Sequence, residues 1–135
     1  GRVRLTVEFR SGSNAARDTF IASLQRYADE VVATAADTRI AFERLSDADP
    51  AVCSDVARDA IRDGCATAGI SCIDMASGAG HDAMHVANAG PMGMIFIPCR
   101  GGRSHCPEEW VEPKDLAAGA TVLLEALLAL DVRLD

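Results

Sequence analysis

The stretch from Ser77 to Trp110 has the sequence SGAGHDAMHVANAGPMGMIFIPCRGGRSHCPEEW and carries the strongest structural signals of the chain. Within it, residues 92–98 form a short apolar run that ends at a proline, as is typical of a central strand covered on both faces. The chain then turns at Gly101 and Gly102 and presents His105 just after that strand. Open α/β sheets place ligand-contacting groups at this position. The stretch therefore predicts an α/β fold with a ligand site beside His105.

The first part of the chain predicts a strand–helix–strand unit. Apolar and polar residues alternate over residues 3–9, which indicates a strand with one covered face. Residues 11–14 supply a turn and a helix cap, and apolar residues then recur at helical spacing as far as Val32. A second alternating stretch over residues 39–43 predicts the returning strand, so the unit covers residues 1–46.

A polar junction that ends at Pro50 separates this unit from the second part of the chain. Proline is favoured in the first turn of a helix, and apolar residues at helical spacing follow it as far as Ala68. Gly69 is then suited to end this helix. The other elements that the pattern predicts are a short strand over residues 71–75, a short helix over residues 81–89 and a last helix that begins at Pro113.

Length, charge and cysteine content narrow the class of protein. The chain has 135 residues, enough for one domain with a buried core. Its net charge is −7 and its 13 basic residues are scattered, whereas a grip on phosphates needs clustered Lys and Arg, so nucleic acid is not an expected partner. Its five cysteines form no C-x-x-C pair, so we expect reduced thiols in a cytoplasmic protein. The C-terminal apolar run contains Glu125 and is too short to span a bilayer, so no membrane is expected.

Two motifs, SGAGHDA at residues 77–83 and IFIPCRGGRSHCPEEW at residues 95–110, together resemble a known enzyme family. They are similar to the metal-dependent amidohydrolases that act on N-carbamoyl amino acids, ureidopropionate and allantoate, within the clan of dinuclear metallopeptidases. The resemblance implies that residues 1–46 are the second half of an inserted α+β lid and dimerisation domain. Residues 47–135 are then the C-terminal part of the catalytic α/β domain. Members of this family are much longer, so the chain is expected to be the C-terminal part of a larger enzyme.

The metal centre that the resemblance implies has two divalent ions, zinc or manganese, with His105 as one of the ligands. A neutral imidazole on a strand-end loop suits zinc when further ligands converge on it. Considered alone, such a histidine is more often a hydrogen-bonded loop residue, and the S-H-x-P-E context favours the ligand role. The resemblance places the general base and the other ligands upstream of Gly1. The chain by itself is therefore expected to be inactive.

Arg10 is the first candidate for substrate binding. It ends the first predicted strand on the polar face, and a guanidinium binds a carboxylate through two parallel hydrogen bonds. The resemblance implies that this arginine holds the carboxylate of the substrate, and the alternative is a surface pair with Glu8 or Asp18. The glycines of the SGAGHDA turn let the backbone approach a ligand closely. The resemblance implies that Gly80 and His81 line the substrate pocket there.

Other polar residues of the two motifs have weaker assignments. His81 and Asp82 have the alternatives of orienting each other or capping a helix. His85 lies one turn after His81, but because no third ligand is evident it is expected to be a packed or surface residue. Cys99 and Cys106 flank the histidine loop without an activating base, so we expect both to be small buried residues. The carboxylates after the loop are expected on a solvated face or capping the last helix: Glu108, Glu109 and Glu112.

The function that the resemblance implies is hydrolysis of a carbon–nitrogen bond in an N-carbamoyl amino acid or a related ureido acid. The expected partners are a small carboxylate substrate and a second copy of the chain, bound through the lid domain. One alternative is an aminoacylase or dipeptidase of the same clan, and Arg10 at the strand end favours the ureido branch over it. Another is a non-catalytic dimerisation module that pairs through an exposed strand edge and needs neither His105 nor Arg10.

Overall fold

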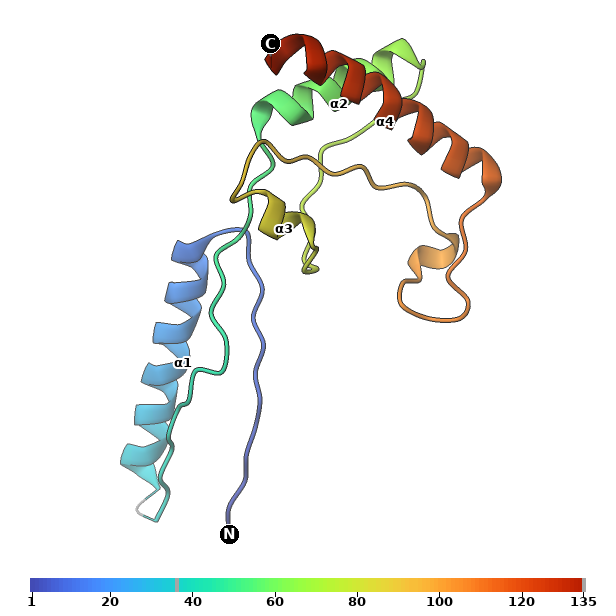
Figure 1. Cartoon of the computed structure of the whole chain (residues 1–135). Helices are drawn as coiled ribbons and strands as arrows, with labels where there is room; N and C mark the ends of the chain where they lie inside the picture. Colours follow the sequence, from blue (N-terminus) through green and yellow to red (C-terminus); the bar gives the residue numbers. More distant parts are fainter. Residues whose placement is uncertain (36, 135) are drawn as a thin grey trace. The chain divides into compact units, whose positions relative to one another are not determined.

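The computed structural model describes residues 1–35 and 37–134 of the chain. Two compact units make up the chain, one of Gly1–Ala51 with Ala76–Ala79 and one of Val52–Met75 with Gly80–Asp135. The helices, coloured along the chain in Figure 1, are α1 (Asn14–Thr34), α2 (Asp55–Thr67), α3 (Ala83–Val86), the 3-10 helix η1 (Arg100–Gly102) and α4 (Pro113–Leu134). The assignment of residues 1–46 to a lid domain and 47–135 to a catalytic domain stays a prediction, and Ala36 and Asp135 lie outside the described residues.

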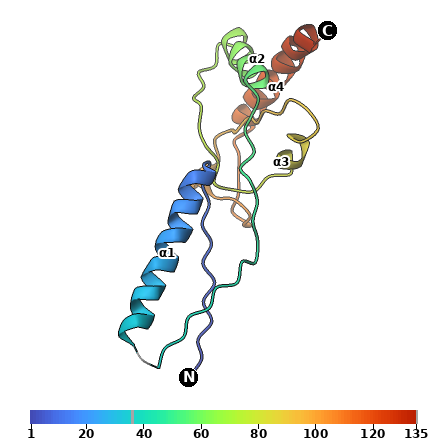
Figure 2. The same ribbon diagram turned by 90° about the vertical axis from the view of Figure 1, so that its left-hand side faces the viewer.

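The first unit is built around α1, at the position that the helical spacing predicts. Ser13 caps the helix, because its side chain accepts a hydrogen bond of 3.3 Å from the Ala16 backbone N–H. The segments before and after α1 run alongside it in both views (Figures 1 and 2). Phe9 stacks on Phe20 of α1 with ring centroids 4.4 Å apart, so the first segment is attached to the helix by an aromatic contact.

Ion pairs attach the second flanking segment to the start of α1. Arg17 donates to the Ala48 carbonyl over 3.2 Å and lies 2.8 Å from a carboxylate oxygen of Asp47. Asn14 donates to Asp49 over 2.9 Å. The polar junction that the sequence predicts before Pro50 therefore packs against the N-terminal turn of α1.

The predicted sheet is absent from residues 1–35 and 37–134, where the structure assigns helices and turns but no β-strand. The segments predicted as strands, at residues 3–9, 39–43, 71–75 and 92–98, have non-helical backbone without a hydrogen-bonded ladder. The reason is that alternation indicates which face each side chain takes, whereas a strand also needs a paired neighbour. Val3 and Leu5, predicted to face a core, are each 83% exposed. The helical part of the α/β prediction is thus confirmed, and the sheet part is not.

The second unit is organised by α2, whose ends are both capped. Ser54 accepts from the Ala57 N–H over 3.4 Å and donates its own N–H to the Met92 carbonyl over 2.8 Å. The helix therefore begins at Asp55 rather than at Pro50 as predicted, because Ser54 takes the cap position. At the other end Gly69 has φ +66, and the Ile70 N–H reaches back to the Cys65 carbonyl over 2.8 Å. This left-handed closure confirms the predicted role of Gly69.

Helices α2 and α4 pack directly against each other, and small residues make this possible. A Cβ atom on Gly64 would lie 2.9 Å from the Val122 carbonyl oxygen and 3.1 Å from the Ala126 nitrogen. The backbones thus approach so closely that only glycine fits. The buried apolar side chains of this unit are Ala57, Ala60, Cys65, Met92, Val122 and Ala126.

The segment after α3 lies against α4. Ile97 fills the space beside Gly119, where a Cβ atom would be 2.5 Å from the Ile97 Cγ2 atom. The short helix predicted over residues 81–89 is reduced to α3, with hydrogen-bonded turns after it. None of the helices in the described part of the chain combines the length and the hydropathy that a transmembrane span requires.

Candidate functional site

The loop over residues 99–112 carries His105 and is closed at its base by backbone contacts. The Arg100 N–H donates to the Trp110 carbonyl over 2.8 Å, which joins the two arms of the loop. The turn itself is made by Gly101 and Gly102, with φ of +63 and +64. Such angles favour glycine, so these two residues permit the tight reversal. The predicted turn after the apolar run is therefore confirmed.

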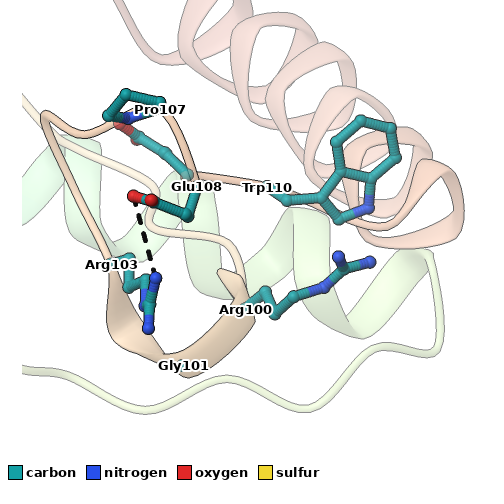
Figure 3. Close-up of a pocket in the computed structure, with 7 residues that line it drawn as sticks. Arg100, Gly101, Arg103, Pro107, Glu108 and Trp110 are labelled. Carbon is teal, nitrogen blue, oxygen red and sulfur yellow. Dashed lines mark ion pairs between the residues drawn. The ribbon is translucent and has the colours of Figure 1, made fainter.

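The same loop lines an open surface pocket of about 550 Å³, which we call the loop pocket (Figure 3). On one side the Arg100 guanidinium lies over the Trp110 ring, 5.5 Å from its centroid. On the other side Arg103 and Glu108 approach each other, with 3.7 Å between the closest nitrogen and oxygen. The residues that line the loop pocket are Arg100, Gly101, Arg103, Pro107, Glu108, Glu109 and Trp110.

His105 has an unusual backbone conformation at the tip of this loop. Its φ is +56, in the left-handed region that residues with a Cβ atom seldom adopt. The His105 N–H donates to the Glu109 Oε2 atom over 2.8 Å, and the Glu109 N–H donates to the Cys106 carbonyl over 3.0 Å. Glu109 is exposed, as predicted, but sequence reasoning missed its hydrogen bond to His105. A capping box has a similar pattern, in which a Glu side chain accepts from a backbone N–H a few residues before it. The spacing of Glu109 four residues after His105 was therefore the signal that could have predicted this bond.

The other residues of the loop differ in part from their predicted roles. Cys99 and Cys106 are half-buried rather than buried, and the Cys99 thiol donates to the Arg103 carbonyl over 2.9 Å. Glu112 is exposed, as the predicted solvated face requires, and pairs with Arg100 at 3.1 Å. His85 is exposed, in agreement with its predicted position at the surface.

The metal ligands that His105 would need are not supplied by the described residues. In residues 1–35 and 37–134, no three His, Cys, Asp or Glu side chains come together in an arrangement that could hold a metal ion. A structural zinc ion takes four ligands and a catalytic one takes three from the protein. The described residues alone therefore do not fit a metal centre, and His105 could contribute one donor to such a centre.

Arg10 lies in the first unit and contacts the glycine turn. Its Nη1 atom donates to the Gly78 carbonyl over 2.9 Å, and its Nε atom donates to Glu8 over 2.7 Å. The predicted alternative, a surface pair with Glu8, is thus present, while Asp18 contacts Arg17 at 3.4 Å. The Arg10 side chain remains 56% exposed. More than half of the side chain is therefore open to solvent.

The other predicted pocket residues lie in the second unit. The His81 ring packs edge-on against Phe96, with centroids 5.6 Å apart and an interplanar angle of 61°. Gly80 faces open space, since nothing lies within 4 Å of a Cβ atom built on it. Asp82 precedes α3 without a side-chain capping bond, so the capping alternative for Asp82 is wrong.

Burial in the second unit changes the pKa of one cysteine, Cys65. Desolvation raises the pKa of the Cys65 thiol, and a hydrogen bond with Cys72 raises it further. The Cys65 thiol is thus held in its neutral form, which is poorly nucleophilic.

Comparison with known proteins gives consistent results. The model of peptidase family M20/M25/M40 matches residues 3–129. The N-carbamoyl-L-amino-acid amidohydrolase of Paenarthrobacter aurescens is 34% identical over 97% of this chain and 32% of its own length. The allantoate amidohydrolase of Bacillus subtilis is 44% identical over 46% of this chain and 15% of its own length. The chain thus spans about a third or less of the length of these relatives.

A solved structure shares the fold. A protein from Burkholderia cenocepacia, described as an amidohydrolase/peptidase, superposes with a TM-score of 0.77 at 36% identity. The superposition covers 87% of this chain and 28% of the other.

Proposed function

We propose that this chain, which belongs to peptidase family M20/M25/M40, is part of an amidohydrolase that cleaves a carbon–nitrogen bond in ureido acids such as N-carbamoyl amino acids or allantoate. The names of the N-carbamoyl-L-amino-acid and allantoate amidohydrolases among its relatives support this substrate class. The observation that carries the proposal is the contact of Arg10 with the Gly78 carbonyl. It puts a guanidinium at the backbone of the SGAGHDA motif, at Gly78.

Arg10 binds the carboxylate of the substrate in this proposal. Its Nε and Nη1 atoms are held by Glu8 and Gly78, which limits the rotation of the guanidinium plane. The outer edge, formed by Nη2 and the second N–H of Nη1, then offers two parallel donors to a carboxylate. The two existing contacts pre-organise the side chain, so less conformational entropy is lost when the substrate binds.

Gly80 and His81 line the pocket in this proposal. With open space at the Gly80 Cα atom, a ligand can approach the backbone without meeting a side chain. The His81 ring is oriented by its edge-on contact with Phe96. Both residues therefore contribute shape and polar contacts to the part of the substrate beyond its carboxylate.

Enzymes of this family generally use divalent metal ions. We propose that the complete site holds two, zinc or manganese, with His105 as one ligand. Since the described residues do not complete such a centre, the remaining ligands and the general base belong to other parts of the protein. The task of this chain is then to place the His105 imidazole at the tip of the 99–112 loop.

The proposal includes a second copy of the chain as a partner and a cytoplasmic location. Dimerisation through residues 1–46 is supported by the exposed apolar side chains of the first segment, where Val7 is 62% exposed beside the more exposed Val3 and Leu5. The cytoplasmic location is supported by the cysteines, all of which are free thiols.

A substrate panel tests the proposed function. The full-length protein, supplied with zinc or manganese, is assayed on N-carbamoyl amino acids, allantoate, N-acetyl amino acids and dipeptides. We expect release of ammonia from a carbamoyl or ureido acid and little turnover of the other two classes. Preferred cleavage of N-acetyl amino acids or dipeptides would contradict the ureido assignment and favour an aminoacylase or dipeptidase. Absence of turnover on every substrate would favour the non-catalytic module.

A further inference from the structure

We propose that Glu109 is the positioning residue of His105, and that its carboxylate holds the His105 backbone in the left-handed conformation from which the imidazole is presented. This inference rests on the proposed role of His105. It assigns a function to a residue that sequence patterns place on a solvated face or at the cap of the last helix. Its basis is the hydrogen bond of 2.8 Å from the His105 N–H to the Glu109 Oε2 atom.

The chain reverses at His105, whose φ is +56. Pro107 disfavours helical backbone angles at Cys106, the residue before it, so the residue after His105 is biased away from a tight turn of its own. A residue with a Cβ atom keeps this strained conformation only where the surroundings enforce it. A carboxylate that accepts from the strained residue's own N–H is such a constraint, because charge-assisted hydrogen bonds are the strong ones.

Glu109 is itself fixed, so it can act as an anchor. Its N–H donates to the Cys106 carbonyl over 3.0 Å, which closes a tight turn between the two residues. The next residue, Trp110, is tied through its carbonyl to Arg100 at the base of the loop. The carboxylate of Glu109 therefore approaches the His105 N–H from a backbone that is held on both sides.

The two adjacent glutamates have different partners, which separates their roles. Glu108 approaches Arg103 at 3.7 Å across the loop pocket (Figure 3). Glu109 has no ion pair in the described part of the chain, and its contact is the His105 backbone. A surface ion pair contributes little to stability. The Glu109 carboxylate instead accepts from the N–H of His105 and thereby fixes the backbone from which the His105 imidazole projects. The loss of Glu109 therefore acts through His105.

The test compares Glu109→Ala, Glu109→Gln and His105→Ala in the full-length protein, with Glu112→Gln as a control from the same loop. Glutamine keeps an oxygen acceptor without the charge, and alanine removes the acceptor. Hydrogen–deuterium exchange is measured at the His105 amide by mass spectrometry with residue-level fragmentation. The kcat and KM for an N-carbamoyl amino acid are measured on the same preparations.

We expect Glu109→Ala to speed exchange at the His105 amide on the order of 10- to 100-fold, as the loss of a hydrogen bond to a charged acceptor implies. It should lower kcat more than it raises KM, and Glu109→Gln should restore most of both properties. Unchanged exchange at His105 in Glu109→Ala would overturn the inference, as would a glutamine variant as impaired as the alanine variant. Faster exchange in Glu109→Ala combined with full activity of His105→Ala would instead overturn the proposed function of His105.

Discussion

The Arg10 guanidinium donates to the Gly78 carbonyl over 2.9 Å, although 68 residues separate the two in the sequence. Both belong to the first unit, which takes in the short segment Ala76–Ala79 from an otherwise distant part of the chain. The glycine turn of the SGAGHDA motif is thus tied to the N-terminal segment that carries Arg10. The Arg10 guanidinium and the backbone at Gly78 therefore lie side by side, although they come from distant segments of the chain.

The close approach of α2 to α4 predicts a destabilising effect of Gly64→Ala. The added methyl group would lie 2.9 Å from the Val122 carbonyl oxygen, a backbone atom that cannot rotate away. Overpacking of this kind costs about 1–3 kcal/mol, which exceeds the gain of about 1 kcal/mol from replacing glycine in a helix. We expect a lower midpoint of urea unfolding. Gly90→Ala is the control, because nothing lies within 4 Å of its added Cβ atom. A higher midpoint for Gly64→Ala would show that the helices do not pack at this distance.

The Arg62–Asp74 ion pair predicts a pH dependence of stability. The hydrogen bond that Asp74 accepts from Arg62 is the main reason that the pKa of Asp74 lies below its usual value of 3.8. A depressed pKa in the folded state stabilises the fold above the unfolded pKa, and this contribution is lost as the pH falls through the folded pKa. Asp74→Asn should therefore lower the midpoint of urea unfolding at pH 7, and the difference from the unsubstituted protein should shrink below pH 3.8.

Both Asp74 and Arg62 are exposed, so the effect is expected to be small and to weaken with added salt. Asp29→Asn, at an exposed aspartate of α1, provides the control for removal of a negative charge. A stability difference for Asp74→Asn that stayed constant from pH 7 to pH 3 would show that the ion pair is not formed in solution.

The proposed ligand role of His105 predicts that His105→Ala and His85→Ala differ. His105 lies at the tip of the 99–112 loop, with its backbone N–H bonded to Glu109, whereas His85 lies in α3. Changes at metal ligands or their supporting residues weaken metal sites by factors of roughly 10–100. His105→Ala in the full-length protein should therefore remove most activity and lower the bound metal, measured by elemental analysis. His85→Ala should leave both nearly unchanged. Equal behaviour of the two variants would mean that the ligand lies elsewhere.

The longer helices and some of their ends could be predicted from the sequence because their signals are local, although the start of α2 and the length of α3 differ from the prediction. The cap at Ser13 and the left-handed Gly69 depend on a few neighbouring residues, and both lie where the pattern indicates. The strands could not be predicted in the same way, because alternation over residues 3–9 does not reveal a pairing partner. The structure shows non-helical segments there, with exposed apolar side chains.

The roles of the candidate site residues stay predictions. The sequence singles out Arg10 at the end of a predicted strand and His105 after a pair of glycines. Their contacts are not visible. The carbonyl of Gly78 and the carboxylate of Glu109 become partners through chain reversals whose geometry depends on φ angles. Backbone partners of this kind carry no side-chain signature, so a motif search misses them.

Because Arg10 binds the substrate carboxylate in the proposed function, Arg10→Lys should impair the use of substrates that carry a carboxylate. Lysine keeps the charge but loses the planar pair of donors. Because a hydrogen bond to a charged group contributes about 1.5–3 kcal/mol, kcat/KM for an N-carbamoyl amino acid should fall on the order of 10- to 150-fold. Arg4→Lys, at an exposed position of the same segment, should have little effect.

The decisive measurement is kcat/KM of the unsubstituted and Arg10→Lys proteins on two substrates, an N-carbamoyl amino acid and its analogue with the carboxylate amidated. The account predicts a large loss on the acid and little further loss on the amide, because the amide never used the guanidinium pair. The bound metal should be the same in both proteins. Equal losses on the two substrates would contradict the account, since Arg10 would then only support its segment through Glu8 and Gly78.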